Sequence, residues 1–420
     1  MKALIYKSEI RGKVIAPSSK SYTIRGLMCA ALAKGQTEII SPLGSDDTEA
    51  AIEVLSKIRV RVLQNKDSWQ VSGGNFVEPK ADLFCRESAT TLRFMTAISA
   101  LVPGKCRLTS KPSLARRPIE PLLQALRQLG IDCSQDDKAA IVIQGGRLSG
   151  GVTELPGNIS SQFVSALLLI SPFATEGIKI RLTTPLESQP YILMTLEYLD
   201  KFGIKVESSP DLREFTTVKQ SYQPAKFKVE GDWSSASYLL ALGAMGGEIE
   251  VENLNARSLQ GDKVILDFLQ DMGASVTIGT SSITVARSRL KALKADMTDC
   301  IDLLPTVAVL AASAEGTSQF DGIARARLKE SDRVAAVREG LERMGIQVTE
   351  EKNRLTITGS PARGSVIDTR GDHRIAMAFS LLGTVAGETT IEGAECVTKT
   401  YPEYWEILKG LGGEVQIDGK

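Results

Sequence analysis

The chain has little of what most metal and cofactor sites require. Its 420 residues include one histidine, and its six cysteines form no C-x-x-C pair. This excludes the usual zinc patterns and gives no disulfide framework. A phosphate-binding G-x-x-x-x-G-K-[ST] loop and a G-x-G-x-x-G dinucleotide fingerprint are also absent. We therefore expect a site without metal or cofactor, in a protein of the reducing cytoplasm.

Excess charge and long apolar runs are missing too. Lys+Arg and Asp+Glu both number 50, so no global field attracts nucleic acid or an anionic membrane. Apolar stretches such as 163–170 are far too short to span a bilayer, and charge interrupts the N-terminal residues where a signal peptide would have its apolar core. We expect a soluble monomer with small-molecule partners, without nucleic-acid or membrane partners.

What the sequence does contain is one unit repeated six times. In each copy a glycine follows an alanine- and leucine-rich run and precedes a β-like segment, at a spacing of about seventy residues. A chain of this length exceeds what one hydrophobic core usually organises, so six copies predict two domains of three. The six glycines are Gly35, Gly104, Gly177, Gly247, Gly316 and Gly387.

The fifth copy shows the expected order of elements. An apolar run at 303–314 predicts a helix that Gly316 ends, and 317–320 predicts a strand. A second helix is expected at about 331–344, followed by two short strands at 346–348 and 355–358. Each copy is therefore predicted to be β-α-β-α-β-β, with helices on one side of a small mixed sheet.

The ends of the chain predict how the two lobes are divided. The sixth copy ends at the C-terminus, so the N-terminal strand at 10–16 is expected to complete the lobe made by copies four to six. This gives one discontinuous lobe of residues 1–17 and 231–420, and a second lobe of residues 18–230. The chain would cross between the lobes near Ser18 and near Gly231.

Cations stand at the predicted helix starts, where the helix dipole disfavours them. Free N–H groups at a helix start bind phosphate or carboxylate, and Lys or Arg adds charge-assisted bonds. Two pairs, Ser21 with Arg25 and Lys329 with Arg333, have the spacing of one helical turn. One basic cluster alone is usually a solvated face, but recurrence in several copies predicts a ligand with several negative charges. The cations in the predicted first turns are Lys20, Arg25, Arg93 and Arg374.

Helix capping is the alternative interpretation for the serines and aspartates at these positions, and we adopt it for Ser234 and Ser235. Asp302 and Glu330 stand among cations, which makes them the acid/base candidates, with a capping or ion-pair role equally open. A lone histidine is usually structural, and Arg374 would tend to keep His373 neutral. The position of His373 at a helix start nevertheless favours a ligand contact.

Five motifs are spread along the whole chain: PSSKSYTIR at 17–25, SSQF at 160–163, LKESDR at 328–333, GDHRIAM at 371–377 and KTYP at 399–402. In this order they resemble the motifs of the 5-enolpyruvylshikimate-3-phosphate synthase family. That resemblance implies a two-lobed inside-out α/β barrel with three β-α-β-α-β-β units per lobe. It also implies transfer of the carboxyvinyl group of phosphoenolpyruvate to the 5-hydroxyl of shikimate 3-phosphate, on the route to chorismate and the aromatic amino acids.

The resemblance also implies roles for single residues. Asp302 would be the base, with Lys20 and Glu330 moving protons. The residues implied for shikimate 3-phosphate are Lys20, Ser21, Arg25, Ser160, Ser161, Ser188, Tyr191, Asp302, Arg325 and Lys329. Those implied for phosphoenolpyruvate are Lys20, Ala89, Arg117, Gln162, Arg333, His373, Arg374 and Lys399.

The chain departs from the family pattern at two places. Where the family usually reads GNAGTAxR, residues 86–93 read RESATTLR, so Ala89 replaces a glycine that lines the phosphoenolpyruvate pocket. Its methyl group is expected to crowd the inhibitor glyphosate more than the shorter substrate. Arg325 stands where the family commonly has asparagine, and it is expected to add a bond to the shikimate phosphate.

Two other functions compete with this interpretation. The enolpyruvyl transferase that acts on UDP-N-acetylglucosamine shares the repeat, but it typically carries a reactive cysteine in a mobile loop, and the region around Arg116 and Arg117 has none. A six-unit ring around DNA is the second alternative. Zero net charge and cations gathered at helix starts argue against it.

Overall fold

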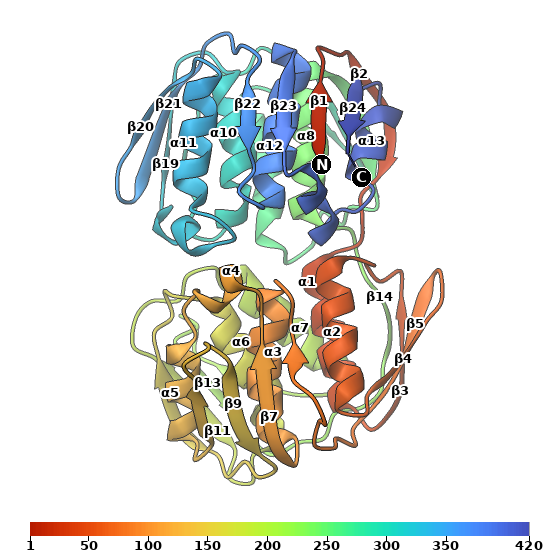
Figure 1. Cartoon of the computed structure of the whole chain (residues 1–420), viewed down its shortest axis with the longest axis vertical. Helices are drawn as coiled ribbons and strands as arrows, with labels where there is room; N and C mark the ends of the chain where they lie inside the picture. Colours follow the sequence, from red (N-terminus) through yellow and green to blue (C-terminus); the bar gives the residue numbers. More distant parts are fainter. Residues whose placement is uncertain (420) are drawn as a thin grey trace. The chain divides into compact units, whose positions relative to one another are not determined.

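The computed structural model describes residues 1–419, and the chain divides into two compact units (Figure 1). Unit 1 comprises Met1–Pro17 and Glu230–Lys420, and unit 2 comprises Ser18–Val229. The second crossing between the units thus falls one residue before the expected boundary. All six cysteines are free thiols, and all but Cys396 are buried. Within the described residues, no helix has both the length and the apolar character needed to cross a membrane.

Unit 2 contains three four-stranded sheets, each of mixed type. In the third repeat the first two strands are parallel and the remaining pairs are antiparallel, as the β-α-β-α-β-β pattern predicts. Its elements are α1 (Lys20–Leu32), β3 (Gly35–Ile40), α2 (Asp46–Lys57), β4 (Arg61–Gln64) and β5 (Ser68–Gly73) in the first repeat; β6 (Leu83–Phe84), α3 (Ala89–Ile98), β7 (Gly104–Thr109), α4 (Pro112–Ala115), α5 (Glu120–Gln128), β8 (Asp132–Gln135) and β9 (Ile141–Gly145) in the second; and β10 (Gly151–Leu155), α6 (Ser161–Ile170), β11 (Ile178–Leu182), α7 (Gln189–Lys201), β12 (Glu207–Ser208), β13 (Glu214–Thr217) and β14 (Lys226–Lys228) after them.

Unit 1 repeats this arrangement with three further four-stranded sheets. Short 3-10 helices, labelled η, precede or replace part of several α-helices. The elements are β1 (Lys2–Ile5) and β2 (Ile10–Ile15); α8 (Trp233–Gly246), β15 (Gly247–Glu252), η3 (Gly261–Val264), α9 (Ile265–Asp271), β16 (Ser275–Ile278) and β17 (Ser282–Ala286); β18 (Lys294–Asp296), η4 (Ile301–Leu303), α10 (Leu304–Ala312), β19 (Thr317–Asp321), η5 (Ala324–Leu328), α11 (Arg333–Arg343), β20 (Gln347–Glu350) and β21 (Arg354–Thr358); and β22 (Val366–Asp368), α12 (His373–Ala386), β23 (Thr389–Glu392), η6 (Ala394–Lys399), α13 (Tyr404–Gly410) and β24 (Val415–Asp418).

Two N-terminal strands complete unit 1, where the sequence had predicted one. Strand β2 runs parallel to β15 in the sheet of the fourth repeat. Strand β1 lies between β23 and β24 and pairs antiparallel with both, so it supplies the strand that the sixth repeat lacks. Unit 2 obtains its missing first strand from its own far end, because β14 runs parallel to β3. Each unit therefore has a sheet in which strands from the two ends of that unit pair with each other.

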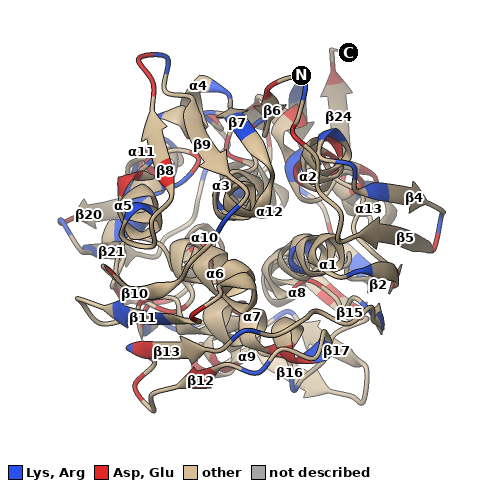
Figure 2. Ribbon diagram, turned by 90° about the horizontal axis from the view of Figure 1, so that it is seen from below, with Lys and Arg blue, Asp and Glu red and all other residues tan. Residues whose placement is uncertain are grey.

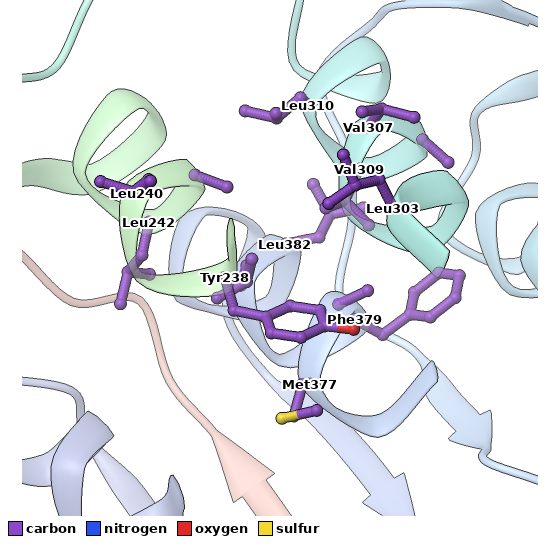
Figure 3. Close-up of a cluster of buried hydrophobic side chains, with 14 of the residues drawn as sticks. Tyr238, Leu240, Leu242, Leu303, Val307, Val309, Leu310, Met377, Phe379 and Leu382 are labelled. Carbon is purple, nitrogen blue, oxygen red and sulfur yellow. The ribbon is translucent and has the colours of Figure 1, made fainter. Parts of the chain in front are cut away.

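The first helices of the repeats form the core of each unit, and the sheets lie outside them. All nine residues of α10 are buried, which fits a helix that is apolar on every side. Figure 3 shows apolar side chains of α8, α10 and α12, among them Tyr238, Val309 and Phe379, in one buried cluster. Figure 2 shows α6 and α10 without charged residues, whereas charged residues lie on outer strands, basic ones on β11 and an acidic one on β13. Burying each large apolar side chain of these core helices contributes about 1.5–3 kcal/mol to the stability of the fold.

The repeated glycine has different physical reasons in different copies. Gly316 and Gly387 adopt φ of 96° and 81°, which side chains rarely allow, at the turn from the core helix to the next strand. Gly247 has an extended backbone instead. A Cβ atom at Gly247 would lie 1.6 Å from the carbonyl oxygen of Ile10, so glycine is needed there because β2 approaches closely.

Candidate functional site

Arg333 is the centre of an ion cluster in unit 1. It is the first residue of α11 and its side chain is 1% exposed. Its Nε donates to Asp372 Oδ2 at 2.8 Å, its Nη1 donates to Asp302 Oδ1 at 2.6 Å, and its Nη2 donates to Glu330. These carboxylates hold the pKa of Arg333 above its usual value, although burial alone would lower it. One guanidinium thus fixes three carboxylates from three different segments.

Asp302 is the carboxylate that most cations reach. It lies in η4, immediately before α10, and its side chain is 13% exposed. Besides Arg333, Lys329 Nζ lies 3.1 Å from Oδ1 and Arg374 Nη2 lies 3.8 Å from Oδ2. Burial raises the pKa of Asp302, but the positive charges of these neighbours outweigh it and hold the pKa well below the usual value. Asp302 is therefore ionised throughout the neutral pH range.

The sequence predicted that Lys329 and Arg333 lie one turn apart on a single helix, and this is wrong. Lys329 follows η5, and α11 begins only at Arg333, after Asp332 caps it by accepting from the N–H of Ala335 at 3.0 Å. The two cations still converge because both contact Asp302. Burial lowers the pKa of Lys329, and the negative charge of Asp302 opposes that shift.

The start of α12 adds two more predicted residues to the cluster. Asp372 caps this helix, and its Oδ1 accepts from the N–H of Arg374 at 3.0 Å. His373 is 1% exposed, with Nδ1 3.8 Å from Asp372 Oδ1. Lys399, at the end of η6, lies with Nζ 3.6 Å from Glu330 Oε1. Arg325 is the second residue of η5, and its Nη2 donates to the carbonyl of Thr298.

The capping role expected for Ser234 and Ser235 is wrong. Asp232 caps α8, because its carboxylate accepts from the N–H of Ser235 at 2.7 Å. Ser234 instead donates its hydroxyl proton to Asp262 and accepts from Arg374 Nη2 at 3.2 Å. The fourth repeat thus contributes more than a helix cap to the unit 1 cluster.

In unit 2, Lys20 is the first residue of α1 and its Nζ lies 2.8 Å from Asp47 Oδ2. Asp47 belongs to α2 and is 2% exposed. The sequence had not singled out Asp47, because the pair Asp46-Asp47 reads as ordinary acidic residues in the first turn of a helix. A buried carboxylate held against the lysine of the family motif makes it part of the candidate site.

Arg25 is a second buried cation of unit 2, with 1% exposure. Its Nη1 donates to the carbonyl of Ser21 at 3.0 Å, its Nε to Thr195 Oγ1 at 2.9 Å, and its Nη2 to the carbonyl of Tyr191 at 3.0 Å. Burial lowers the pKa of Arg25 to about 10, so it keeps its charge at neutral pH. Arg25 therefore joins α1 to the start of α7, where Ser188 stands with a left-handed φ of 56°.

Arg93 ties the starts of α3 and α6 together. Its Nη1 donates to Ser160 Oγ at 3.1 Å and to Gln162 Oε1 at 2.7 Å, and its guanidinium lies 5.0 Å from the ring centre of Phe163. Gln162 Nε2 donates in turn to Thr90 Oγ1 at 3.0 Å. Ala89 and Ser161 are the first residues of α3 and α6, and Arg117 follows α4.

The two units therefore hold different parts of the predicted set. Direct contacts in unit 1 join Asp302, Lys329, Glu330, Arg333, Arg374 and Lys399. Contacts in unit 2 form two groups, one around Arg25 and one around Arg93, with Lys20 paired to Asp47. Across residues 1–419, no three His, Cys, Asp or Glu side chains are placed to hold a metal ion. The arrangement can bind anions through its cations and transfer protons through Asp302 and Glu330.

Comparison with known proteins finds similar sequences and structures over nearly the whole length of the chain. Residues 5–408 match the profile of the EPSP synthase (3-phosphoshikimate 1-carboxyvinyltransferase) family. A 3-phosphoshikimate 1-carboxyvinyltransferase of Dehalococcoides mccartyi (strain ATCC BAA-2266 / KCTC 15142 / 195) is 50% identical over 420 residues and covers 100% of both chains. The EPSP synthase structure from Acinetobacter baumannii is 26% identical, has a TM-score of 0.83 and covers 99% of this chain and 100% of that chain. The enolpyruvyl transferase NikO from Streptomyces tendae is 16% identical with a TM-score of 0.82, covering 99% of this chain and 98% of that chain, and shares the fold.

Proposed function

The chain belongs to the EPSP synthase family, and from that membership we propose that it transfers the carboxyvinyl group of phosphoenolpyruvate to the 5-hydroxyl of shikimate 3-phosphate. The products are 5-enolpyruvylshikimate 3-phosphate and phosphate, in the biosynthesis of chorismate and the aromatic amino acids. The observation that carries the proposal within the site is Asp302, an ionised carboxylate held among Lys329, Arg333 and Arg374. Such a group can accept a hydroxyl proton while its neighbours hold substrate anions.

We propose two substrate-binding sets, in agreement with the family motifs. Shikimate 3-phosphate is assigned Lys20, Ser21, Arg25, Ser160, Ser161, Ser188 and Tyr191 from unit 2, and Asp302, Arg325 and Lys329 from unit 1. Phosphoenolpyruvate is assigned Lys20, Ala89, Arg117 and Gln162 from unit 2, and Arg333, His373, Arg374 and Lys399 from unit 1. The number of cations in both sets fits substrates that carry phosphate and carboxylate groups.

The reaction needs one base and one acid. Asp302 takes the proton of the 5-hydroxyl as its oxygen attacks C2 of phosphoenolpyruvate, and a proton is added to the methylene carbon at C3. Glu330 and Lys20 are assigned to move that second proton. The tetrahedral adduct then loses phosphate, and C3 gives up a proton as the double bond forms again. Cations around the leaving phosphate stabilise its growing charge, which is usually the largest single contribution to catalysis.

Release of phosphate tests this function directly. Mixing the purified chain with phosphoenolpyruvate and shikimate 3-phosphate is expected to release one phosphate for each 5-enolpyruvylshikimate 3-phosphate formed. Neither substrate alone should do so. Phosphate release with UDP-N-acetylglucosamine, together with none in the presence of shikimate 3-phosphate, would replace the proposal with the alternative transferase.

We further propose that the enzyme is a cytoplasmic monomer that needs no metal or cofactor. Free thiols in all six cysteines fit a reducing compartment. Sedimentation of the chain at micromolar concentration tests the monomer, and unchanged turnover in a chelator tests the independence from metal.

Ala89 predicts reduced sensitivity to glyphosate. Ala89 is the first residue of α3 and is 8% exposed, so its methyl group occupies space in a packed helix start. Removing one methyl group from a crowded pocket changes affinity by about 1–3 kcal/mol. Ala89→Gly is therefore expected to lower the inhibition constant of glyphosate about tenfold or more, measured against phosphoenolpyruvate. An inhibition constant for the wild type equal to or below that of Ala89→Gly would contradict the prediction.

A further inference from the structure

Ser234 and Asp262 form a chain of contacts behind Arg374. Ser234 is the second residue of α8, and Asp262 lies in η3. Arg374 Nη2 donates to Ser234 Oγ at 3.2 Å, and Ser234 Oγ donates to Asp262 Oδ2. Because a guanidinium has no acceptor, the serine must accept from Arg374, and its one proton is left for Asp262. We propose that Ser234 and Asp262 are positioning residues that hold Arg374 beside Asp302 for the carboxyvinyl transfer. This inference rests on that proposed function.

Asp262 has features that a purely structural residue would not need. It is 3% exposed, and within residues 1–419 it has no ion pair within 4 Å and no hydrogen bond to Oδ1. Burying an ionisable carboxylate so sparsely bonded destabilises a fold, and asparagine or serine would cost less in that place. The α8 cap does not explain it either, since Asp232 provides that cap. The unusual carboxylate serves the contact with Ser234.

The position of Arg374 explains why it needs such support. Its Nη2 lies 3.8 Å from Asp302 Oδ2 and 3.2 Å from Ser234 Oγ, so the guanidinium stands between the proposed base and the serine. An arginine side chain has several rotatable bonds, and an oxygen on its far side limits their freedom. Ser234 therefore keeps Arg374 from moving away from the position in which it holds substrate charge near Asp302.

The charge of Asp262 depends on pH in the range where the enzyme can be assayed. Burial raises the pKa of Asp262 to about 6, the negative charge of Asp302 adds to that shift, and Arg374 opposes it. The other groups that face Asp262 are Asp232, which caps α8, Ser234 of α8, and the Cys300 thiol before η4. As pH falls through about 6, Asp262 becomes neutral and the anchor of Arg374 loses its charge. This adds an acid limb to turnover that depends on Asp262.

Steady-state kinetics of three variants test the pair. Ser234→Ala is expected to lower kcat/KM for phosphoenolpyruvate by about 10- to 100-fold, because misplacing one charged group costs this much. The KM for shikimate 3-phosphate should change less than about threefold, since Arg374 is assigned to phosphoenolpyruvate. Ser234→Thr keeps the hydroxyl and is expected to restore most of the activity. Ser380→Ala is the matched control, because Ser380 is a buried serine of α12 whose hydroxyl contacts Tyr404 and the Met377 carbonyl.

Asp262→Asn tests the pH dependence. Substrate phosphates also titrate near pH 6, so the profile is compared as the ratio of variant to wild type at each pH. The ratio is expected to rise toward one as pH falls below about 6, because wild-type Asp262 is then neutral too. The double variant Ser234→Ala/Asp262→Asn should lose no more kcat/KM than the less active of the two single variants, since both substitutions act through Arg374.

Several results would overturn the inference while leaving the enzyme assignment intact, because wild-type turnover is measured in the same assays. Ser234→Ala with kcat/KM within about threefold of wild type would exclude positioning. An equal loss in Ser380→Ala, or in Ser234→Thr, would show a general effect of altering buried serines. A constant Asp262→Asn ratio across the pH range would remove the role of the Asp262 charge.

Discussion

Replacing Asp302 with asparagine is expected to lower kcat by about 10²- to 10⁴-fold, the usual contribution of a general base. Asparagine keeps the shape of the side chain but cannot accept the proton of the 5-hydroxyl. Asp302 is ionised and can accept that proton, because Lys329, Arg374 and Arg333 hold its pKa well below the usual value. Asparagine at this position removes that ability. Asp302→Ala should abolish turnover as well, with the added loss of the contacts to these cations.

Substrate affinity separates a base from a residue that only binds. Dissociation constants for shikimate 3-phosphate measured by calorimetry should agree between Asp302→Asn and wild type within about tenfold, or roughly 1.4 kcal/mol. Asp321→Asn is a matched control, because Asp321 is paired with Arg354 in an outer sheet and is 43% exposed. A kcat of Asp302→Asn within about tenfold of wild type would remove Asp302 as the base.

Arg333→Leu is expected to give the largest loss of stability in the chain. It removes one buried cation and leaves Asp302, Glu330 and Asp372 without their shared partner. Breaking a buried ion pair from one side costs about 3–5 kcal/mol, because the remaining charge stays buried. For a unit of this size the first melting transition should fall by roughly 6–20 °C, measured by calorimetry at neutral pH.

The pH dependence identifies the cause of that loss. Without Arg333, the buried carboxylates lose their shared cation, so binding of a proton by the folded cluster becomes more favourable than in the wild type. Relative to the wild type, stability then falls as pH rises, and the deficit of Arg333→Leu should be smaller at pH 5 than at pH 7.5. Arg338→Leu, on the same helix, removes an arginine that is 30% exposed and should change stability by at most about 1 kcal/mol. Equal deficits at both pH values would show lost packing as the cause.

Local patterns along the sequence were enough to predict the scaffold. The glycine at the end of each core helix marked all six repeats, because a turn with positive φ or a close backbone approach requires that residue whatever surrounds it. The cations at helix starts could be singled out because the helix dipole makes their position unusual, and anion binding by them stays a prediction. Both signals depend on the chain within a few residues.

The remaining features depend on residues that are distant in sequence. Asp47 meets Lys20 across 27 positions, and Asp262 meets Ser234 across 28. Nothing near Asp262 in sequence distinguishes it from an exposed acidic residue. Ser234 was misjudged for the same reason, because serine at a helix start is common as a cap and only the neighbouring Asp232 shows that the cap is already taken.

The pairing of strands from opposite ends of each unit sets the order in which the chain can fold during synthesis. Unit 2 is continuous, so all its strands are available once Val229 has been made. Strand β1 is synthesised before the other described strands, yet both of its partners, β23 and β24, are synthesised after all the rest. At about 5–20 residues per second it waits roughly 20–80 s with both edges unpaired. The chain therefore completes one unit while the opening strands of the other are still without partners, and charged ends such as Lys2 and Lys7 protect those edges from aggregation in the meantime.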